Sequence, residues 1–182
     1  MDPRTFLPPH RVPVAAVPEL GALAPIAEPL GEVRGPAVIA FLRHVGCPFA
    51  EATMKALSEE TARHPEIDWI AVSHAKLEAS DHWCTAIGAS RHVRLVIDEE
   101  RSAYGAWGLG RTSLTHFAGS RSLSAVAELA HEGIRNRHPA GSRWQGAGTF
   151  AVNADGEVVW RHIPRHAGAL PDLADAAVAA LR

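Results

Sequence analysis

The feature that most constrains the fold is a strand-like run followed closely by a cysteine and a proline. Residues 38–43 are mostly apolar and rich in strand-forming side chains, and a short turn leads from them to Cys47 and Pro48. Proline is favoured at the first position of a helix, so residues 48–64 are predicted to form a helix that begins at this cysteine. The sequence therefore predicts a thiol where a strand turns into a helix.

A thiol at the start of a helix lies near backbone N–H groups without partners and near the positive end of the helix dipole. Both favour the thiolate, which is the reactive form of cysteine. Arg43 and His44 precede the turn and are candidates to add positive charge beside the sulfur. We therefore expect Cys47 to be a solvent-exposed nucleophile, with Arg43 and His44 as further catalytic candidates. A small buried cysteine with a packing role is the alternative.

Strand and helix patterns alternate through the rest of the chain. From Gly35 onward, further strands are predicted at 67–73 and 93–98. A β-hairpin is predicted from strands at 149–152 and 157–162, which flank the turn residues Asn153 to Gly156. Helices are predicted at 77–87, 99–107, 123–137 and 170–181. This order indicates an α/β fold with a central mixed β-sheet and helices on both of its faces.

The first 34 residues differ from the rest of the chain because they are rich in proline. Proline at this density prevents long helices and central strands, yet apolar residues are interspersed throughout. We expect residues 1–34 to form an extended N-terminal arm that packs on the domain formed by residues 35–182, or on a partner subunit. A homodimer is one way to cover such an arm.

Composition narrows the classes of function. The 182 residues suit one domain, and a net charge of -2 gives no basic stripe for nucleic acid. No apolar run reaches the ~20 residues of a membrane span, and the first residues lack the plan of a secretory signal. We therefore expect no nucleic-acid partner, no membrane insertion and a cytoplasmic location. Two cysteines in such a chain are predicted to be reduced thiols.

Four segments carry a more specific signal when they are taken in order. They are Phe41-Leu42-Arg43-His44-Val45-Gly46-Cys47-Pro48-Phe49, then the stretch from Tyr104 to Gly110, then Gly141 to Gln145, then Gly148-Thr149-Phe150 leading into the hairpin. Together they resemble the AhpC/TSA-type, peroxiredoxin-like family over roughly residues 36–181. The resemblance implies a thioredoxin-like fold.

The resemblance also implies a chemistry, in which Cys47 occupies the position of the peroxide-reducing cysteine. Its thiolate would attack the O–O bond of a peroxide and become a sulfenic acid, which a second thiol then reduces. The substrate would be a small molecule, either a peroxide or an organic compound. Candidate substrate-binding residues in the matching segments are Pro48, Trp107, Arg143, Trp144, Gly148 and Thr149.

The chain departs from the family pattern at the active turn. Many relatives carry a second cysteine three residues after the first, where this chain has Ala50, so a disulfide across the helix turn is impossible. His44 and Ala40 replace the threonine and proline of typical peroxiredoxins, and Gly148 stands where many thioredoxin-fold proteins have a cis-proline. Cys84 is the remaining candidate for a resolving thiol, and an external thiol reductant is the alternative.

Two other readings stay open beside a peroxiredoxin-like thiol oxidoreductase. The scaffold could serve a different reaction on an organic, biosynthetic substrate, without peroxide chemistry. It could also be a binding module without catalysis, because fold alone does not determine function. We expect no cofactor and no metal, since the two cysteines, Cys47 and Cys84, do not form a Cys-x-x-Cys pair.

Overall fold

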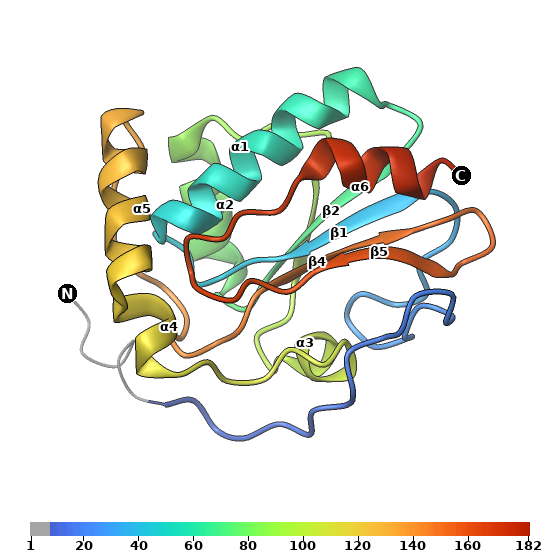
Figure 1. Cartoon of the computed structure of the whole chain (residues 1–182), viewed down its shortest axis with the longest axis horizontal. Helices are drawn as coiled ribbons and strands as arrows, with labels where there is room; N and C mark the ends of the chain where they lie inside the picture. Colours follow the sequence, from blue (N-terminus) through green and yellow to red (C-terminus); the bar gives the residue numbers. More distant parts are fainter. Residues whose placement is uncertain (1–7) are drawn as a thin grey trace.

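The computed structural model describes residues 8–182, with side chains throughout that range except at residues 117 and 118 (Figure 1). Five strands form one mixed sheet in the order β3-β2-β1-β4-β5. The strands are β1 (Ala37–Phe41), β2 (Asp68–Ser73), β3 (Arg94–Ile97), β4 (Gly148–Val152) and β5 (Val158–His162). The first three are parallel, and β4 and β5 form the antiparallel hairpin. This confirms the predicted thioredoxin-like α/β fold.

The helices are α1 (Pro48–Arg63), α2 (Leu77–Ile87), α3 (Ser102–Ala106), α4 (Leu114–Ala118), α5 (Ser120–His131) and α6 (Leu173–Ala180). The bounds of α2 are those predicted from the sequence. The helix predicted at 123–137 differs, because it is preceded by the separate short α4 and ends at His131. Gly133, at φ +83°, lies two residues further on and takes a left-handed conformation that does not continue a helix.

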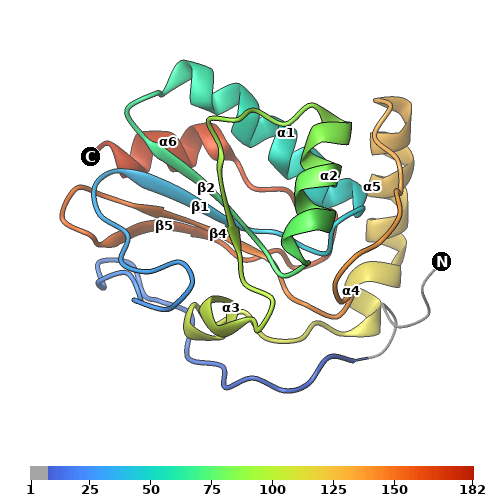
Figure 2. The same cartoon turned by 180° about the vertical axis from the view of Figure 1, so that it is seen from behind.

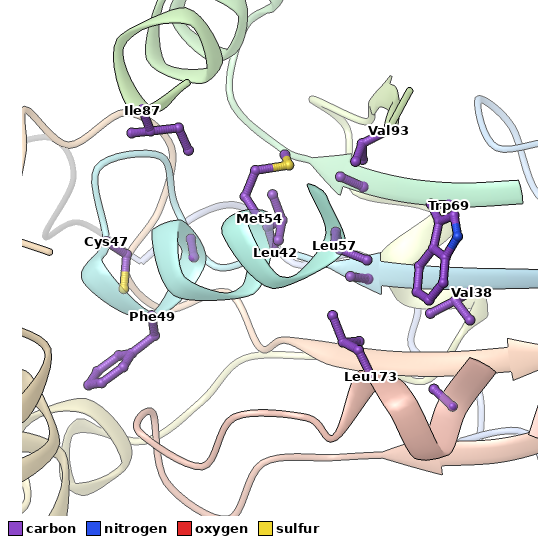
Figure 3. Packing of buried hydrophobic residues seen from close by; sticks show 14 of the residues in the cluster. Val38, Leu42, Cys47, Phe49, Met54, Leu57, Trp69, Ile87, Val93 and Leu173 are labelled. Carbon is purple, nitrogen blue, oxygen red and sulfur yellow. The ribbon is translucent and has the colours of Figure 1, made fainter. Parts of the chain in front are cut away.

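Two apolar clusters lie on opposite faces of the sheet. One lies under α1, α2, α5 and α6 and contains Val38, Met54, Leu57 and Trp69 (Figure 3). The other contains Phe41, Tyr104, Trp107 and Phe150 and lies on the side of α3 and the N-terminal segment (Figure 2). Alternation along β1 divides its side chains between the two clusters, since successive residues of a strand point to opposite faces.

The N-terminal segment from residue 8 to 34 lies on the face that carries α3, with an extended path to about residue 19 and a series of turns after it (Figure 1). Its backbone bonds to the hairpin, where Ala24 N–H donates to Gly156 O at 2.8 Å and Val158 N–H donates to Ala22 O at 2.8 Å. Leu30 and Val33 are buried in the second cluster. The predicted division at residue 34 and the predicted homodimer stay predictions.

In the part of the chain that the structure describes, no helix has the length and apolar character needed to cross a membrane.

Candidate functional site

Cys47 lies where β1 has ended and α1 begins. It is the N-cap residue of α1, with extended backbone angles (φ -76°, ψ 131°), and Pro48 occupies the first helical turn. Its side chain makes no capping hydrogen bond. The carboxyl end of a parallel strand is the usual place for a site in an open α/β sheet. The strand-to-helix placement predicted for this thiol is therefore present.

The turn before Cys47 is fixed by a segment far along the chain. Arg137 N–H donates to Gly46 O at 2.9 Å, and Ala140 N–H donates to Val45 O at 3.2 Å. Gly46 has φ +80°, and a Cβ at this position would lie 2.4 Å from His138 O. A glycine is thus required there, both for the left-handed conformation and for the close approach. Residues 137–140 cover the loop that holds the thiol.

The prediction that the Cys47 sulfur is exposed to solvent is wrong. The residue is 4% exposed and belongs to the apolar cluster on the α1 face. Figure 3 shows it at the first turn of α1, with its sulfur on the side of Phe49. Leu129 and Ile134 of the α5 region belong to the same cluster, so residues distant in sequence contribute to the burial. A reagent reaches this sulfur only when part of that cover opens.

His44 is buried and electrically neutral at neutral pH. Its Nδ1 lies 2.8 Å from Val45 O, and the residue is 3% exposed. Burial is the main cause that lowers the pKa of His44 to about 3, and the positive charges of Arg43 and Arg143 act in the same direction. His44 therefore does not supply a positive charge to a neighbouring thiolate, and Arg43 is the remaining cation of the predicted pair.

Arg43 is buried at the end of β1 and bonds to the loop that carries Arg143. Its Nη2 donates to Arg143 O at 3.1 Å, and the residue is 5% exposed. The structure thus brings together two residues that the sequence analysis named separately. Other basic groups lie near them: burial lowers the pKa of His116, and the charges of Arg43 and His166 lower it further. Two arginines and several histidines therefore gather at this edge of the sheet, and the positive charge comes from the arginines.

A second buried histidine, His74, lies at the same edge of the sheet and bonds to the 141–145 loop. His74 Nε2 accepts from Ser142 N–H at 3.0 Å, and its Nδ1 lies 3.5 Å from the Tyr104 hydroxyl. That hydroxyl lies 2.7 Å from Leu42 O and 2.8 Å from Val72 O, so it joins the ends of β1 and β2. Burial lowers the pKa of His74 to about 4. Sequence reasoning missed His74, His116 and His166, since no motif connects them to Cys47.

A narrow cavity of about 30 Å³ lies beside the first turns of α1. It is bounded by Arg43, Phe49 and Thr53 on one side and by Gly148 and Thr149 at the start of β4 on the other. That volume holds about one or two molecules of the size of water. Gly148 and Thr149 were predicted to bind substrate, and the structure places both beside Arg43 in the wall of this cavity, which Cys47 does not line.

Other predicted residues lie elsewhere or are packed. Pro48 is buried at the start of α1. Trp107 is fully buried and packs against Phe41 and Phe150, with ring centroids at 5.5 and 4.9 Å, in the cluster on the other face of the sheet from Cys47. This position favours a structural role for Trp107. Trp144 lies in the 141–145 loop, where its carbonyl accepts from Thr112 N–H at 2.8 Å.

Cys84 lies on α2 and is partly buried against the first cluster. Burial, followed by the negative charge of Asp81, raises the pKa of the Cys84 thiol to about 11. Only a small fraction of this thiol is ionised at neutral pH, which makes it a poor nucleophile in the folded protein. The two cysteines are both free thiols in the structure.

No group of three or more histidine, cysteine, aspartate or glutamate side chains is arranged to hold a metal ion within the described range 8–182.

A thiol at the start of a helix, on a thioredoxin-like sheet, defines the class as proteins with a peroxiredoxin-like thioredoxin fold. Residues 53–166 match the family model of the AhpC/TSA antioxidant enzyme. This match spans more than half of the chain, so the protein belongs to that family. The matched range begins six residues after Cys47, so the cysteine itself lies outside it. No curated protein matches the chain.

Solved structures give the same fold. A peroxiredoxin-like protein from Aquifex aeolicus is 15% identical, with a TM-score of 0.62 over 92% of this chain and 89% of that one. A thiol peroxidase from Chromobacterium violaceum is 11% identical, with a TM-score of 0.61 over 91% and 87%. The Xanthomonas campestris bacterioferritin comigratory protein is 14% identical, with a TM-score of 0.55 over 91% and 93%. At these identities the likeness concerns the fold.

Proposed function

We propose that the protein is a thiol-dependent oxidoreductase that reduces a small peroxide, with Cys47 as its nucleophile. The Cys47 thiolate attacks one peroxide oxygen, the O–O bond breaks, and water or an alcohol leaves after taking up a proton. The cysteine, oxidised by two electrons, becomes a sulfenic acid. An external thiol then condenses with the sulfenic acid, and a second thiol releases Cys47 by exchange, so that two thiols become one disulfide.

The observation that carries the proposal is the position of Cys47 as N-cap of a sixteen-residue helix at the carboxyl edge of β1. Partial positive charge at a helix N-terminus stabilises a thiolate there. The narrow cavity beside Arg43 lies next to the first turns of α1 and is of a size that suits a small substrate such as hydrogen peroxide, but Cys47 itself does not line it. Membership of the AhpC/TSA family supports the same reaction class.

The burial of Cys47 adds a condition to this mechanism. At 4% exposure the sulfur is closed off from bulk solvent, so the reaction requires local opening of the cover formed in part by residues 137–140. Local opening costs less free energy than global unfolding and repeats rapidly in the native state. We expect the rate with peroxide to depend on this opening as well as on the thiol.

Recycling by an external thiol fits the two cysteines better than an internal disulfide. Ala50 occupies the position where a local partner cysteine would stand, and the raised pKa of Cys84 disfavours its attack as a thiolate. The small-molecule reductant and the expected cytoplasmic location are consistent with each other, since thiols are kept reduced in that compartment.

The test is steady-state peroxide consumption with dithiothreitol as the reductant. We expect turnover for the unmodified protein and for Cys84→Ser, and none above background for Cys47→Ser. The Cys84→Ser variant is the matched control, because it makes the same atomic change at the other thiol. Turnover that survives in Cys47→Ser would remove the proposal.

A different reaction on an organic substrate is the second candidate, and one cavity favours it. This cavity, of about 370 Å³, is bounded by Val45, Trp83, Ala140 and neighbouring residues of α2 and the 137–140 segment. It borders the other side of the Cys47 loop and is mostly apolar. If this second candidate holds, the protein binds a fluorescent apolar probe there and Trp83→Ala abolishes that binding, while peroxide leaves Cys47 unmodified.

A further inference from the structure

A cavity separate from the Cys47 loop lies between the N-terminal segment and the start of α3. It has a volume of about 260 Å³. Figure 1 shows the N-terminal segment running alongside α3 in this part of the molecule. Its lining combines basic side chains with two valines, as follows: His10, Arg11, Arg101, Arg111, Val12 and Val14. Gly110 and Gln145 complete the wall, and no carboxylate is among the residues of the described range 8–182 that line the cavity.

Arg101 is the central residue of this wall. It is 3% exposed, and its backbone takes the left-handed conformation (φ 63°) that few residues other than glycine adopt. Its Nη2 donates to His10 O at 2.9 Å, which is the one hydrogen bond its side chain makes within the described range. A guanidinium has five N–H donors, so most of the hydrogen-bonding capacity of Arg101 is left for a ligand in the cavity.

The charged groups around Arg101 also determine how strongly the cavity attracts an anion. Burial lowers the pKa of Arg101, and the positive charge of Arg111 lowers it further, which indicates that these two side chains are close enough to repel. The negative charges of Asp98 and Glu100 act on the pKa of Arg101 in the opposite direction, and both carboxylates also have other partners. Asp98 accepts from Ser102 N–H and Tyr104 N–H at 2.9 and 3.1 Å, and Glu100 pairs with His10 at 3.7 Å.

We propose that this cavity, which we call the arginine cavity, binds a small ligand that carries a phosphate group. Arginine recognises phosphate through paired hydrogen bonds from its planar fork. A phosphate with up to two negative charges balances Arg101 and Arg111 better than a carboxylate with one. The valines leave room for a small apolar part of the same ligand. This proposal does not depend on the reactivity of Cys47.

The structure also explains how the N-terminal segment closes the arginine cavity. Ala15 N–H donates to Gly105 O at 2.9 Å. A Cβ at Gly110 would lie 3.3 Å from Val14 Cγ2, so the valine already packs on that glycine. We therefore expect bound phosphate to order the segment that carries Arg11 and to protect it from proteases.

The experiment is an NMR titration of the full-length chain with inorganic phosphate at constant ionic strength, with sodium chloride as the balancing salt. We expect saturable one-site binding, with amide shifts at Val12, Val14 and Gly110. Arg111→Ala is expected to weaken binding at least about tenfold, the loss typical of one charge-assisted hydrogen bond. Arg121→Ala, which removes an exposed arginine of α5, is the matched control and is expected to leave the affinity within about twofold.

Several results would overturn the proposal. These are the absence of saturable binding, shifts confined to other parts of the chain, or an equal loss in Arg111→Ala and Arg121→Ala. Acetate that binds as tightly as phosphate would overturn the assignment of a phosphate group. Arg101→Gln is a second variant, which is also expected to weaken binding. Because Arg101 is buried, the fold of this variant is checked by circular dichroism. Arg111 is exposed, so the Arg111→Ala result decides the test even if Arg101→Gln does not fold.

Discussion

At the scale of single residues, the loop after β1 depends on two buried histidines that stay neutral. Burial lowers the pKa of His44 to about 3 and that of His74 to about 4, from an ordinary value of 6.5. Below pH 6.5 the unfolded chain therefore binds protons at these positions while the folded chain does not. Lowering the pH favours unfolding, and this stability is present above pH 6.5 and is lost as the pH falls.

The free energy of unfolding is therefore predicted to fall with decreasing pH, and replacing one of the two histidines is predicted to make this fall less steep. Near pH 5 each of the two histidines contributes a slope approaching about 1.4 kcal/mol of unfolding free energy per pH unit, and the share of His74 falls to about half of this at pH 4, where its folded form begins to take up the proton. His74→Gln is expected to remove its share of that slope, measured by urea unfolding at several pH values. His92→Gln, at an exposed position, is the control and should keep the slope of the unmodified protein. Equal slopes for all three proteins would contradict the prediction.

The residue scale also shows what the sequence can and cannot predict. The place of Cys47 follows from local rules, because a strand-forming run and a proline at a helix start lie within a dozen residues. Its burial does not, since the apolar cluster that contains it also draws on Leu129 and Ile134, and the 137–140 segment bonds to its loop, all more than eighty residues away in the sequence. The neutrality of His44 is likewise a consequence of tertiary packing.

At the scale of elements, α1 and the segment over the Cys47 loop are joined by one ion pair. Arg137 donates to the buried Glu51 carboxylate through Nε at 2.8 Å and Nη2 at 3.2 Å, and Lys55 lies 3.3 Å from the same carboxylate. Burial acts to raise the pKa of Glu51, but the hydrogen bonds from Arg137 and Lys55 outweigh it and lower the pKa. Arg137 therefore holds the cover near Cys47.

Arg137→Gln is predicted to loosen this cover. We expect the alkylation of Cys47 by iodoacetamide, measured by mass spectrometry in a Cys84→Ser background, to be faster by about tenfold, since opening becomes easier by about 1–2 kcal/mol. That figure lies below the cost for a fully buried pair, because the Arg137 side chain is 40% exposed. Lys55→Gln removes the other cation from Glu51 without touching the segment, and its alkylation rate should stay near the original.

The elements themselves were largely predictable. Residues 77–87 carry a complete helix signal, with an apolar face and a glycine at its end, and α2 has those bounds. The division between α4 and α5 was not predicted, because Ser113 and Gly119 give only weak start and stop signals. The prediction for Trp107 was limited in a similar way. Its position in the sequence does not show which face of the sheet it packs on.

At the scale of the whole molecule, the N-terminal segment is seated on α3 through a glycine. A Cβ at Gly105 would lie 2.3 Å from Pro13 O, and the backbone there has no left-handed conformation. In an isolated helix, alanine is favoured over glycine by about 1 kcal/mol. We expect Gly105→Ala to act in the opposite direction here, because the segment must move away.

The measurement is the free energy of unfolding together with limited proteolysis of the N-terminal segment. Gly105→Ala should be less stable than the unmodified protein and should be cleaved faster before residue 20. Ala106→Gly, one position along α3, changes the helix propensity and removes a methyl group that packs on the second cluster, without adding bulk under the N-terminal segment, and should lose about 1 kcal/mol without faster cleavage. A more stable Gly105→Ala protein with an unchanged cleavage rate would show that the segment is not held in this way.

The most direct test of the central claim, that Cys47 is a nucleophile which reduces peroxide, is the mass of the intact protein after a brief pulse of hydrogen peroxide with dimedone present as the sulfenic acid trap. Our account predicts one dimedone adduct, located at Cys47, in the unmodified protein and in Cys84→Ser, and no adduct in Cys47→Ser. An unmodified Cys47 after the pulse, or an adduct found at Cys84 instead, would contradict it.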